Sequence, residues 1–139
     1  NNPPRPWYFS GQWHDNAFCS AEEMVAFCRE FDTPMCFDFS HAKLYCNVTG
    51  RDFREYVRLV APVTRHLHIC DAYGIDGEGM QIGEGEIDMK ETCRLLATHG
   101  DFSQMTWTPE IWQGHNHDYQ GFMIGFSRLH DVPELKHRG

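Results

Sequence analysis

The fold is decided by residues 35–71, MCFDFSHAKLYCNVTGRDFREYVRLVAPVTRHLHICD, in which two strand-like runs enclose a helical pattern. Met35–Phe39 is a short apolar run that ends in polar residues, as is typical of a buried strand. Apolar residues at helical spacing between Phe53 and Val60 predict an amphipathic helix, which Pro62 stops. A second strand-like run follows over His66–Cys70. This order favours two parallel strands joined by a crossover helix.

The same alternation extends to both sides of this stretch. Ser20 and Glu23 have the pattern of a capping box, and Asp88 with Glu91 three residues later predicts another helix N-terminus. The other predicted segments are a helix over 21–31, a polar loop over 40–50, a Gly-rich loop over 74–85, a helix that ends at Gly100, a strand over 104–110 and a helix over 119–126. Together they predict one α/β domain over residues 1–139, built from parallel strand–helix units.

The length of the chain leaves two α/β architectures open. A closed barrel of eight strand–helix units needs about 250 residues, whereas these 139 residues supply three clear units and an additional N-terminal helix. A doubly wound open sheet would be complete at this length, but its usual Gly-rich phosphate turn after the first strand is absent from the sequence. Length alone favours the open sheet.

The composition disfavours several classes of function. A formal charge of −8 and scattered Lys and Arg disfavour nucleic-acid binding, and the sequence has no apolar run long enough to cross a bilayer. Six cysteines stand singly, which indicates reduced core residues in a cytoplasmic protein. Nine histidines among many acidic residues indicate metal chemistry. We therefore expect a cytoplasmic metalloprotein that binds neither nucleic acid nor membrane.

Ionisable residues stand at the carboxyl ends of the three predicted strands. Asp38 ends the first strand, His68 lies near the end of the second, which Asp71 closes, and Glu110 ends the third. In parallel α/β folds these strand ends open on one face of the molecule. Asp, His and Glu together offer the ligands that suit Mn, Mg, Co or Zn. His66 shares one strand face with His68, and we prefer His68 because it lies nearer the strand end.

Four short motifs follow one another in the sequence with helices between them: Asp38–His41 (DFSH), His68–Asp71 (HICD), Ile82–Asp88 (IGEGEID) and Thr108–Glu110 (TPE). In this order they resemble the xylose-isomerase-like TIM barrel superfamily, which includes sugar phosphate isomerases and epimerases, hydroxypyruvate isomerases, inosose dehydratases and apurinic/apyrimidinic endonucleases. The resemblance covers nearly the whole chain. It implies that these parallel (β/α) units form the C-terminal half of a TIM barrel.

The resemblance also implies a set of metal ligands. Asp38 would be the ligand on the sixth barrel strand, His68 on the seventh and Glu110 on the eighth. The fourth ligand of the family, a Glu at the end of the fifth strand, would stand just before Asn1 and is absent from these residues. His41 would bind the substrate or a second metal ion.

For the intact barrel, the resemblance implies a divalent-metal-dependent sugar or sugar phosphate isomerase or epimerase that acts through an enediolate. Glu110 and His41 are the expected catalytic residues. The sugar would contact His41, Asp71 and two tryptophans of the predicted rim loops, Trp7 and Trp112. The intact barrel, rather than this chain alone, would be the enzyme.

Two other functions stay open. The missing carboxylate favours a noncatalytic module that binds sugar or mediates assembly within a larger protein. An endonuclease-like phosphodiesterase ranks third, because Gly77 and Gly79 stand where the endonucleases carry additional zinc ligands.

The sheet edges of a half-barrel favour a homo-oligomer or association with the missing N-terminal half. Some acidic and histidine residues are interpreted as loop residues outside the site. They are Glu78, Glu84, Glu86 and residues 114–118.

Overall fold

The computed structural model describes residues 1–4, 7–14 and 16–136, and of residues 7–9 and 12–14 it describes only the backbone. The strands of this part of the chain are β1 (Trp7–Phe9), β2 (Gln12–His14), β3 (Met35–Asp38), β4 (Thr64–Ile69), β5 (Asp71–Tyr73), β6 (Gly77–Met80) and β7 (Thr106–Pro109). The α-helices are α1 (Ala21–Glu30), α2 (Phe39–Thr49), α3 (Phe53–Val60), α4 (Met89–His99) and α5 (Asn116–Leu129).

A three-stranded parallel sheet in the order β3-β4-β7 forms the centre of the fold. Its register places Asp38 beside His68 and His68 beside Thr108, so the three strands end at the same level. The chain passes from β3 to β4 through α2 and α3, and from β4 to β7 through the β5–β6 hairpin and α4. The predicted α/β class with parallel strands is confirmed.

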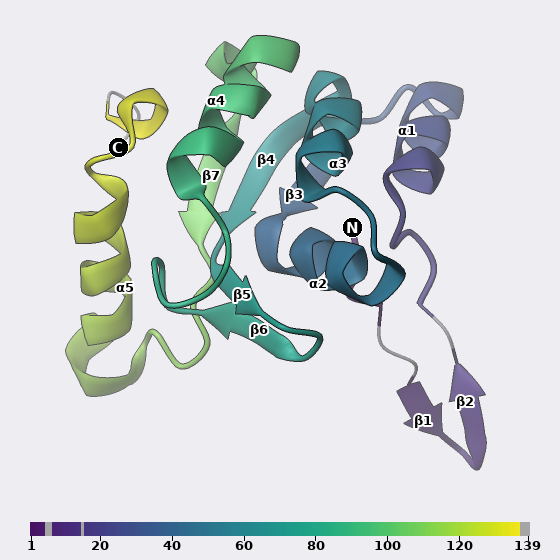
Figure 1. Cartoon of the computed structure of the whole chain (residues 1–139), viewed down its shortest axis with the longest axis horizontal. Coiled ribbons are helices and arrows are strands. Elements are labelled where there is room, and N and C mark those ends of the chain that lie inside the picture. The colour runs from purple at the N-terminus through teal and green to yellow at the C-terminus, as the bar shows by residue number, and fades with distance from the viewer. Residues whose placement is uncertain (5–6, 15, 137–139) are drawn as a thin grey trace.

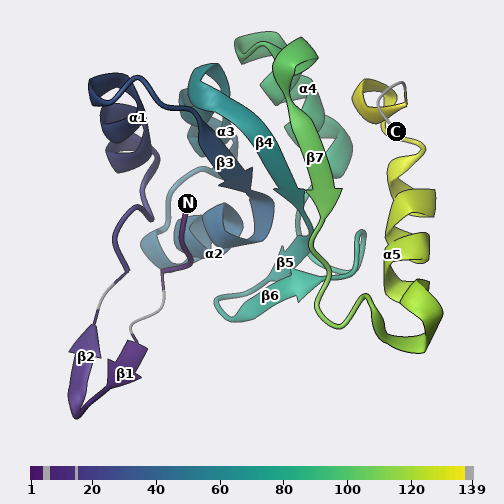
Figure 2. The same ribbon diagram turned by 180° about the vertical axis from the view of Figure 1, so that it is seen from behind.

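One face of the sheet is covered by helices, and in the described part of the chain no helix packs on the other face, which we call the open face. Figures 1 and 2 show α3 and α4 against one face, with α1 beside α3 in the same layer and α5 flanking β7. The fully buried side chains of Phe37, Leu67 and Ile69 alternate along the strands and belong to the core. His66 and His68, which alternate with Leu67 and Ile69 along β4, are only partly buried. The open face therefore carries polar side chains.

The predicted polar loop over 40–50 is wrong, because these residues form most of α2. The Asp38 side chain caps the helix by accepting a hydrogen bond from the backbone N–H of His41, and Gly50 ends it with φ of 71°. Its buried face is interrupted by polar residues in the sequence, which hid the helical period. The residues that α2 buries are Phe39, Ser40, Ala42, Leu44 and Cys46.

The Gly-rich segment over 74–85, predicted as a loop, contains the second strand of an antiparallel hairpin. β5 pairs with β6, and Asp71 lies opposite Met80. Gly77 permits the close pairing, because a Cβ at this position would lie 2.6 Å from the carbonyl oxygen of Tyr73. The hairpin lies at the carboxyl ends of the parallel strands (Figure 1).

Two other elements also differ from the prediction. The β1–β2 hairpin, which pairs antiparallel, carried no recognised sequence signal. α5 spans Asn116–Leu129 rather than 119–126, and residues 117–119 have positive φ, so a kink lies at its start. Such left-handed residues escape a search for apolar periodicity.

The composition predicts that the chain has no membrane-spanning segment and that its cysteines are core residues. No helix in the described part of the chain is long and apolar enough to span a bilayer. Five of the six cysteines are buried, and Cys36 is partly exposed. The interpretation of the cysteines as small core residues therefore agrees with their burial.

The central strand should be the most sensitive part of the core. Leu67→Ala removes a fully buried side chain from β4 and should lower the free energy of unfolding by about 2–5 kcal/mol. Leu59→Ala, at a position on α3 that is 39% exposed, should cost much less. Urea denaturation followed by circular dichroism measures both changes, and equal losses would contradict this assignment of the core.

Candidate metal centre

The structure brings Asp38, His68 and Glu110 together at the carboxyl ends of β3, β4 and β7. One possible ligand atom from each residue lies within 4.8 Å of the other two. The Nδ1 atom of His68 lies 2.5 Å from Oε2 of Glu110 and 3.7 Å from Oδ2 of Asp38. One nitrogen of the imidazole therefore lies near both carboxylates. The sequence analysis expected these three residues as metal ligands, and the structure places them side by side.

The Asp38 carboxylate has two functions in the local structure, one for each oxygen. Its side chain is buried, and Oδ1 accepts hydrogen bonds from the Ser40 hydroxyl at 3.0 Å and the His41 backbone N–H at 2.9 Å. These bonds fix the first turn of α2 and the orientation of the carboxylate. Oδ2 faces His68 and His41, and it lies 3.6 Å from Nδ1 of His41. A cation would bind on this second side.

The two carboxylates differ in basicity. Burial acts to raise the pKa of Asp38, but the neighbouring His68 and His41 outweigh it and lower that pKa. Burial, followed by the neighbouring Asp38 carboxylate, raises the pKa of Glu110. The neighbouring Asp38 carboxylate raises the pKa of His68, against the effect of its partial burial. Asp38 is thus the fixed negative charge, and Glu110 is the carboxylate that takes up a proton more readily.

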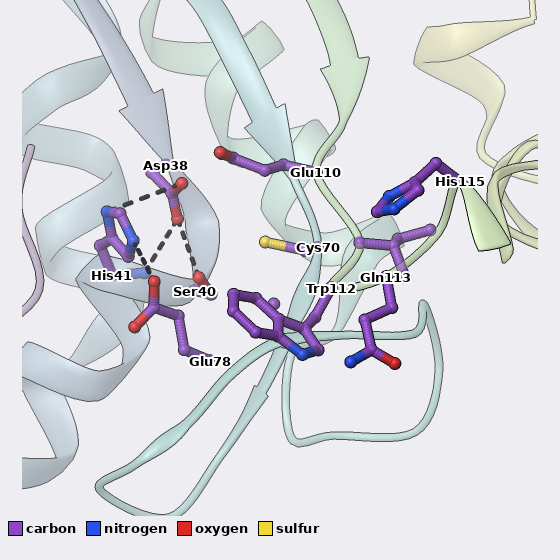
Figure 3. A pocket seen from close by; sticks show the side chains of 11 residues that line it. Asp38, Ser40, His41, Cys70, Glu78, Glu110, Trp112, Gln113 and His115 are labelled. Carbon is purple, nitrogen blue, oxygen red and sulfur yellow. Dashed lines mark hydrogen bonds and ion pairs between the residues drawn. The ribbon is translucent and has the colours of Figure 1, made fainter.

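His41 connects this centre to the β5–β6 hairpin. Its Nε2 lies 3.0 Å from Oε1 of Glu78, and its Nδ1 lies 3.1 Å from the carbonyl oxygen of Asn1. Both partners are hydrogen-bond acceptors, so both bonds form together only when the ring carries a proton on each nitrogen. Figure 3 shows Glu78 reaching His41 from below, on the side away from Glu110.

An open pocket of about 280 Å³ lies over these residues. Its polar side is formed by Asp38, His41, Glu78 and Glu110, and Trp112 lies across from them (Figure 3). The remaining residues that line the pocket are Ser40, Cys70, Gly79, Ile111, Gln113 and His115. A pocket with a few convergent polar groups beside an aromatic face is the usual form of a small-molecule site.

Three of the predicted substrate-binding residues have different surroundings. Trp112 lines the pocket and is 76% exposed, so its indole face is available to a ligand. Asp71 is fully buried, and its carboxylate accepts hydrogen bonds from the backbone N–H groups of Ala72, Gly83 and Ile87. It shapes the loop, and we leave it out of the proposed site. The side chain of Trp7 lies outside the described residues.

Glu78 and His115 line the pocket although the sequence analysis placed both outside the site. Glu78 stands between two glycines, a context typical of a solvated loop. The signal that could have found it is its position in the segment that follows β4, because such segments line the functional face of a parallel sheet. Glu84 and Glu86 agree with the interpretation as loop residues, since their carboxylates bind Arg128 and Asn47, respectively.

His66 lies one layer deeper in the sheet than His68. Its Nδ1 is 2.7 Å from the hydroxyl oxygen of Thr106, and its ring stands edge-to-face against His68 with the centroids 5.3 Å apart. It therefore packs against His68 and does not reach the two carboxylates. This arrangement agrees with the choice of His68 as the residue nearest the strand end.

Comparison with known proteins supplies the family. The family model described as xylose isomerase-like TIM barrel matches residues 9–128, a range that includes the parallel sheet and all three residues of the candidate centre. No curated protein and no solved structure matches the chain. The match extends over most of the chain and agrees with the parallel α/β architecture and with the strand-end position of the site. We conclude that the chain belongs to the xylose isomerase-like TIM barrel family.

Proposed function

We propose that this chain forms part of a divalent-metal-dependent isomerase or epimerase that acts on a sugar or a sugar phosphate. The observation that carries the proposal is the convergence of Asp38, His68 and Glu110 at three adjacent strand ends, within 4.8 Å of one another. Membership of the family supports the same class of chemistry. Active sites of parallel barrels lie at this end of the strands.

The chemistry of the donor set fits a divalent cation. Two carboxylate oxygens and one imidazole nitrogen suit Mn, Mg, Co or Zn, with substrate oxygens or water in the remaining positions. A bound cation would polarise the carbonyl group of the sugar and stabilise the negative charge of an enediolate. The hydrogen bonds that hold Asp38 orient one ligand in advance.

Glu110 is the best candidate for the proton-transfer residue. Its side chain is 53% exposed and lines the pocket, and its pKa is raised, first by burial and then by Asp38. A carboxylate of raised basicity accepts the proton from the carbon beside the carbonyl more readily. His41 lies across the pocket, and because both of its ring nitrogens face acceptors, it would hydrogen-bond a sugar oxygen only in exchange for its contact with Glu78 or with the Asn1 carbonyl oxygen.

Trp112 would bind the sugar ring. Its side chain is exposed at the pocket, and its backbone N–H donates to the carbonyl oxygen of Gly79 at 2.7 Å. This bond ties the tryptophan to the hairpin that carries Glu78. The flat apolar face of an indole suits the C–H face of a sugar, and the acidic groups opposite suit its hydroxyls.

Two glycines disfavour the phosphodiesterase alternative. Gly77 and Gly79 occupy the places of the additional zinc ligands of the endonucleases. A side chain at position 77 would collide with the Tyr73 carbonyl oxygen, and Gly79 has φ of 64° with Trp112 3.4 Å from the position of a Cβ. Sterics at position 77 and the left-handed backbone at position 79 therefore disfavour side-chain ligands at these places, and the net charge of −8 disfavours a polynucleotide.

We further propose that the catalytic unit is a complete barrel, of which residues 1–139 form the C-terminal half. The position of β3 at the edge of the sheet supports this idea. Asn1 hydrogen-bonds to the backbone of this edge strand, so the edge can accept a further strand. The Asn1 amide donates to the Asp38 carbonyl oxygen at 3.1 Å, and its side-chain oxygen accepts from the Asp38 N–H at 2.8 Å. The open face of the sheet would then pack against an N-terminal half or against a second copy.

Metal binding should depend on Glu110. Glu110→Gln removes one charged ligand and should weaken Mn²⁺ binding by about tenfold or more. Glu84→Gln is the matched control, because its side chain is 54% exposed and lies outside the cluster. Isothermal titration calorimetry of the two variants and the unaltered protein measures the affinities. Equal affinities in all three proteins would contradict the proposed ligand set.

Metal affinity should fall as the pH falls. An imidazole binds a metal only when its ligating nitrogen is unprotonated, and the neighbouring Asp38 carboxylate raises the pKa of His68 above its ordinary value. Proton competition therefore begins at a higher pH than for an ordinary histidine and grows below that pKa. Calorimetry in buffers of different ionisation enthalpy should show proton release on binding, which increases towards lower pH. Binding that releases no proton would exclude His68 as a ligand.

The reaction itself is tested by hydrogen exchange at carbon. In D₂O with Mn²⁺ or Co²⁺, the protein with an added N-terminal half should exchange the C–H beside the carbonyl of an aldose or ketose, as NMR can follow. Glu110→Gln should slow the exchange by about 10²–10⁴-fold, whereas Glu84→Gln should not. Sugar binding without exchange would instead support the noncatalytic module, and cleavage of abasic DNA would support the phosphodiesterase.

A further inference from the structure

A second group of metal-ligating side chains lies on the open face of the sheet, below the proposed centre. Cys36 on β3 is the register partner of His66 on β4, one layer deeper than the pair formed by Asp38 and His68. The side chains of Cys36, His66 and His68 lie on the same face because they alternate with buried core residues. Each of the three is partly exposed.

The three side chains are close enough to share an ion. One possible ligand atom from each lies within 4.8 Å of the others, whereas the ligands of a tetrahedral zinc ion are about 3.5 Å apart, as follows from its bond lengths. Side-chain rotations would close the difference. The ring of His66 is already oriented by the 2.7 Å contact between its Nδ1 and the Thr106 hydroxyl, which leaves Nε2 as its ligating atom.

We propose that Cys36, His66 and His68 form a second metal site, which binds Zn²⁺ or a similar thiolate-preferring ion and competes with the carboxylate centre for His68. The proposal depends on the proposed function only through this competition, because His68 belongs to both groups. A thiolate and two imidazoles form a soft to borderline donor set, whereas Asp38 and Glu110 offer hard oxygens.

The two positions should therefore select different ions. Mg²⁺ and Mn²⁺ prefer the oxygen ligands of Asp38 and Glu110. Zn²⁺ and Co²⁺ bind well to the sulfur and nitrogen ligands of the second group. Three protein ligands leave one coordination position open, as in many zinc sites. Because His68 belongs to both groups, an ion bound by Cys36 and His66 would remove a ligand from the carboxylate centre. Zinc at the second site would then weaken manganese binding between Asp38 and Glu110.

Co²⁺ is a suitable probe, because coordination by thiolate gives a near-ultraviolet charge-transfer band that oxygen and nitrogen ligands do not give. The unaltered protein titrated with Co²⁺ should show this band. Cys36→Ser should abolish it, His66→Ala should weaken Co²⁺ binding by about tenfold or more, and Glu110→Gln should keep it. Cys46→Ser is the control, since Cys46 is buried in α2 away from both groups. Circular dichroism checks that each variant is folded.

A second measurement uses the unaltered protein and needs no variant. Zn²⁺ should slow alkylation of Cys36 by iodoacetamide, located by mass spectrometry, whereas Mg²⁺ should leave the rate unchanged. No charge-transfer band, a band that survives in Cys36→Ser, or equal alkylation rates with and without Zn²⁺ would each overturn the second site. A thiolate band in a protein that binds no Mn²⁺ would support the second site while contradicting the proposed function, so the two failures can be distinguished.

Discussion

The fold and the candidate site both depend on the hydrogen bonds of the Asp38 carboxylate. Oδ1 caps α2 through the backbone N–H of His41 and also accepts from Ser40. The carboxylate thus joins the end of β3 to the start of the next helix, and this junction sets the direction in which α2 leaves the sheet. Oδ2 is consequently fixed towards His68. One side chain determines the local chain path and the position of the first proposed metal ligand.

Charged and polar side chains gather around Asp38 because they lie on the face of the sheet that is not buried in the core. The sheet buries Phe37, Leu67 and Ile69 on its covered face, and the alternation of a strand then places polar residues on the open face. At the strand ends this face meets the β5–β6 hairpin, which brings Glu78 to His41. Two carboxylates of unequal basicity around one imidazole provide the elements of both metal binding and proton transfer.

Sequence patterns predicted the parts of the fold in which one physical signal acts alone. The helix over 53–60 and the buried strands show clear apolar periods, and the parallel order follows from them. α2 was missed because polar residues interrupt its buried face and hide the helical period in the sequence. The strand-end rule anticipated that Asp38, His68 and Glu110 lie together. Glu78 was missed because its approach to His41 depends on hairpin pairing, a long-range contact that local spacing does not encode.

The double duty of Asp38 has a consequence for the interpretation of related sequences. A protein of this family that had lost catalysis would still need a helix cap at this position, and selection for folding alone would retain Asp. Glu110 caps no helix and its side chain is half exposed, so only chemistry would preserve it. The presence of an aspartate at position 38 is therefore weak evidence of an active enzyme. Whether a relative keeps a glutamate at position 110 is the more informative marker of retained activity.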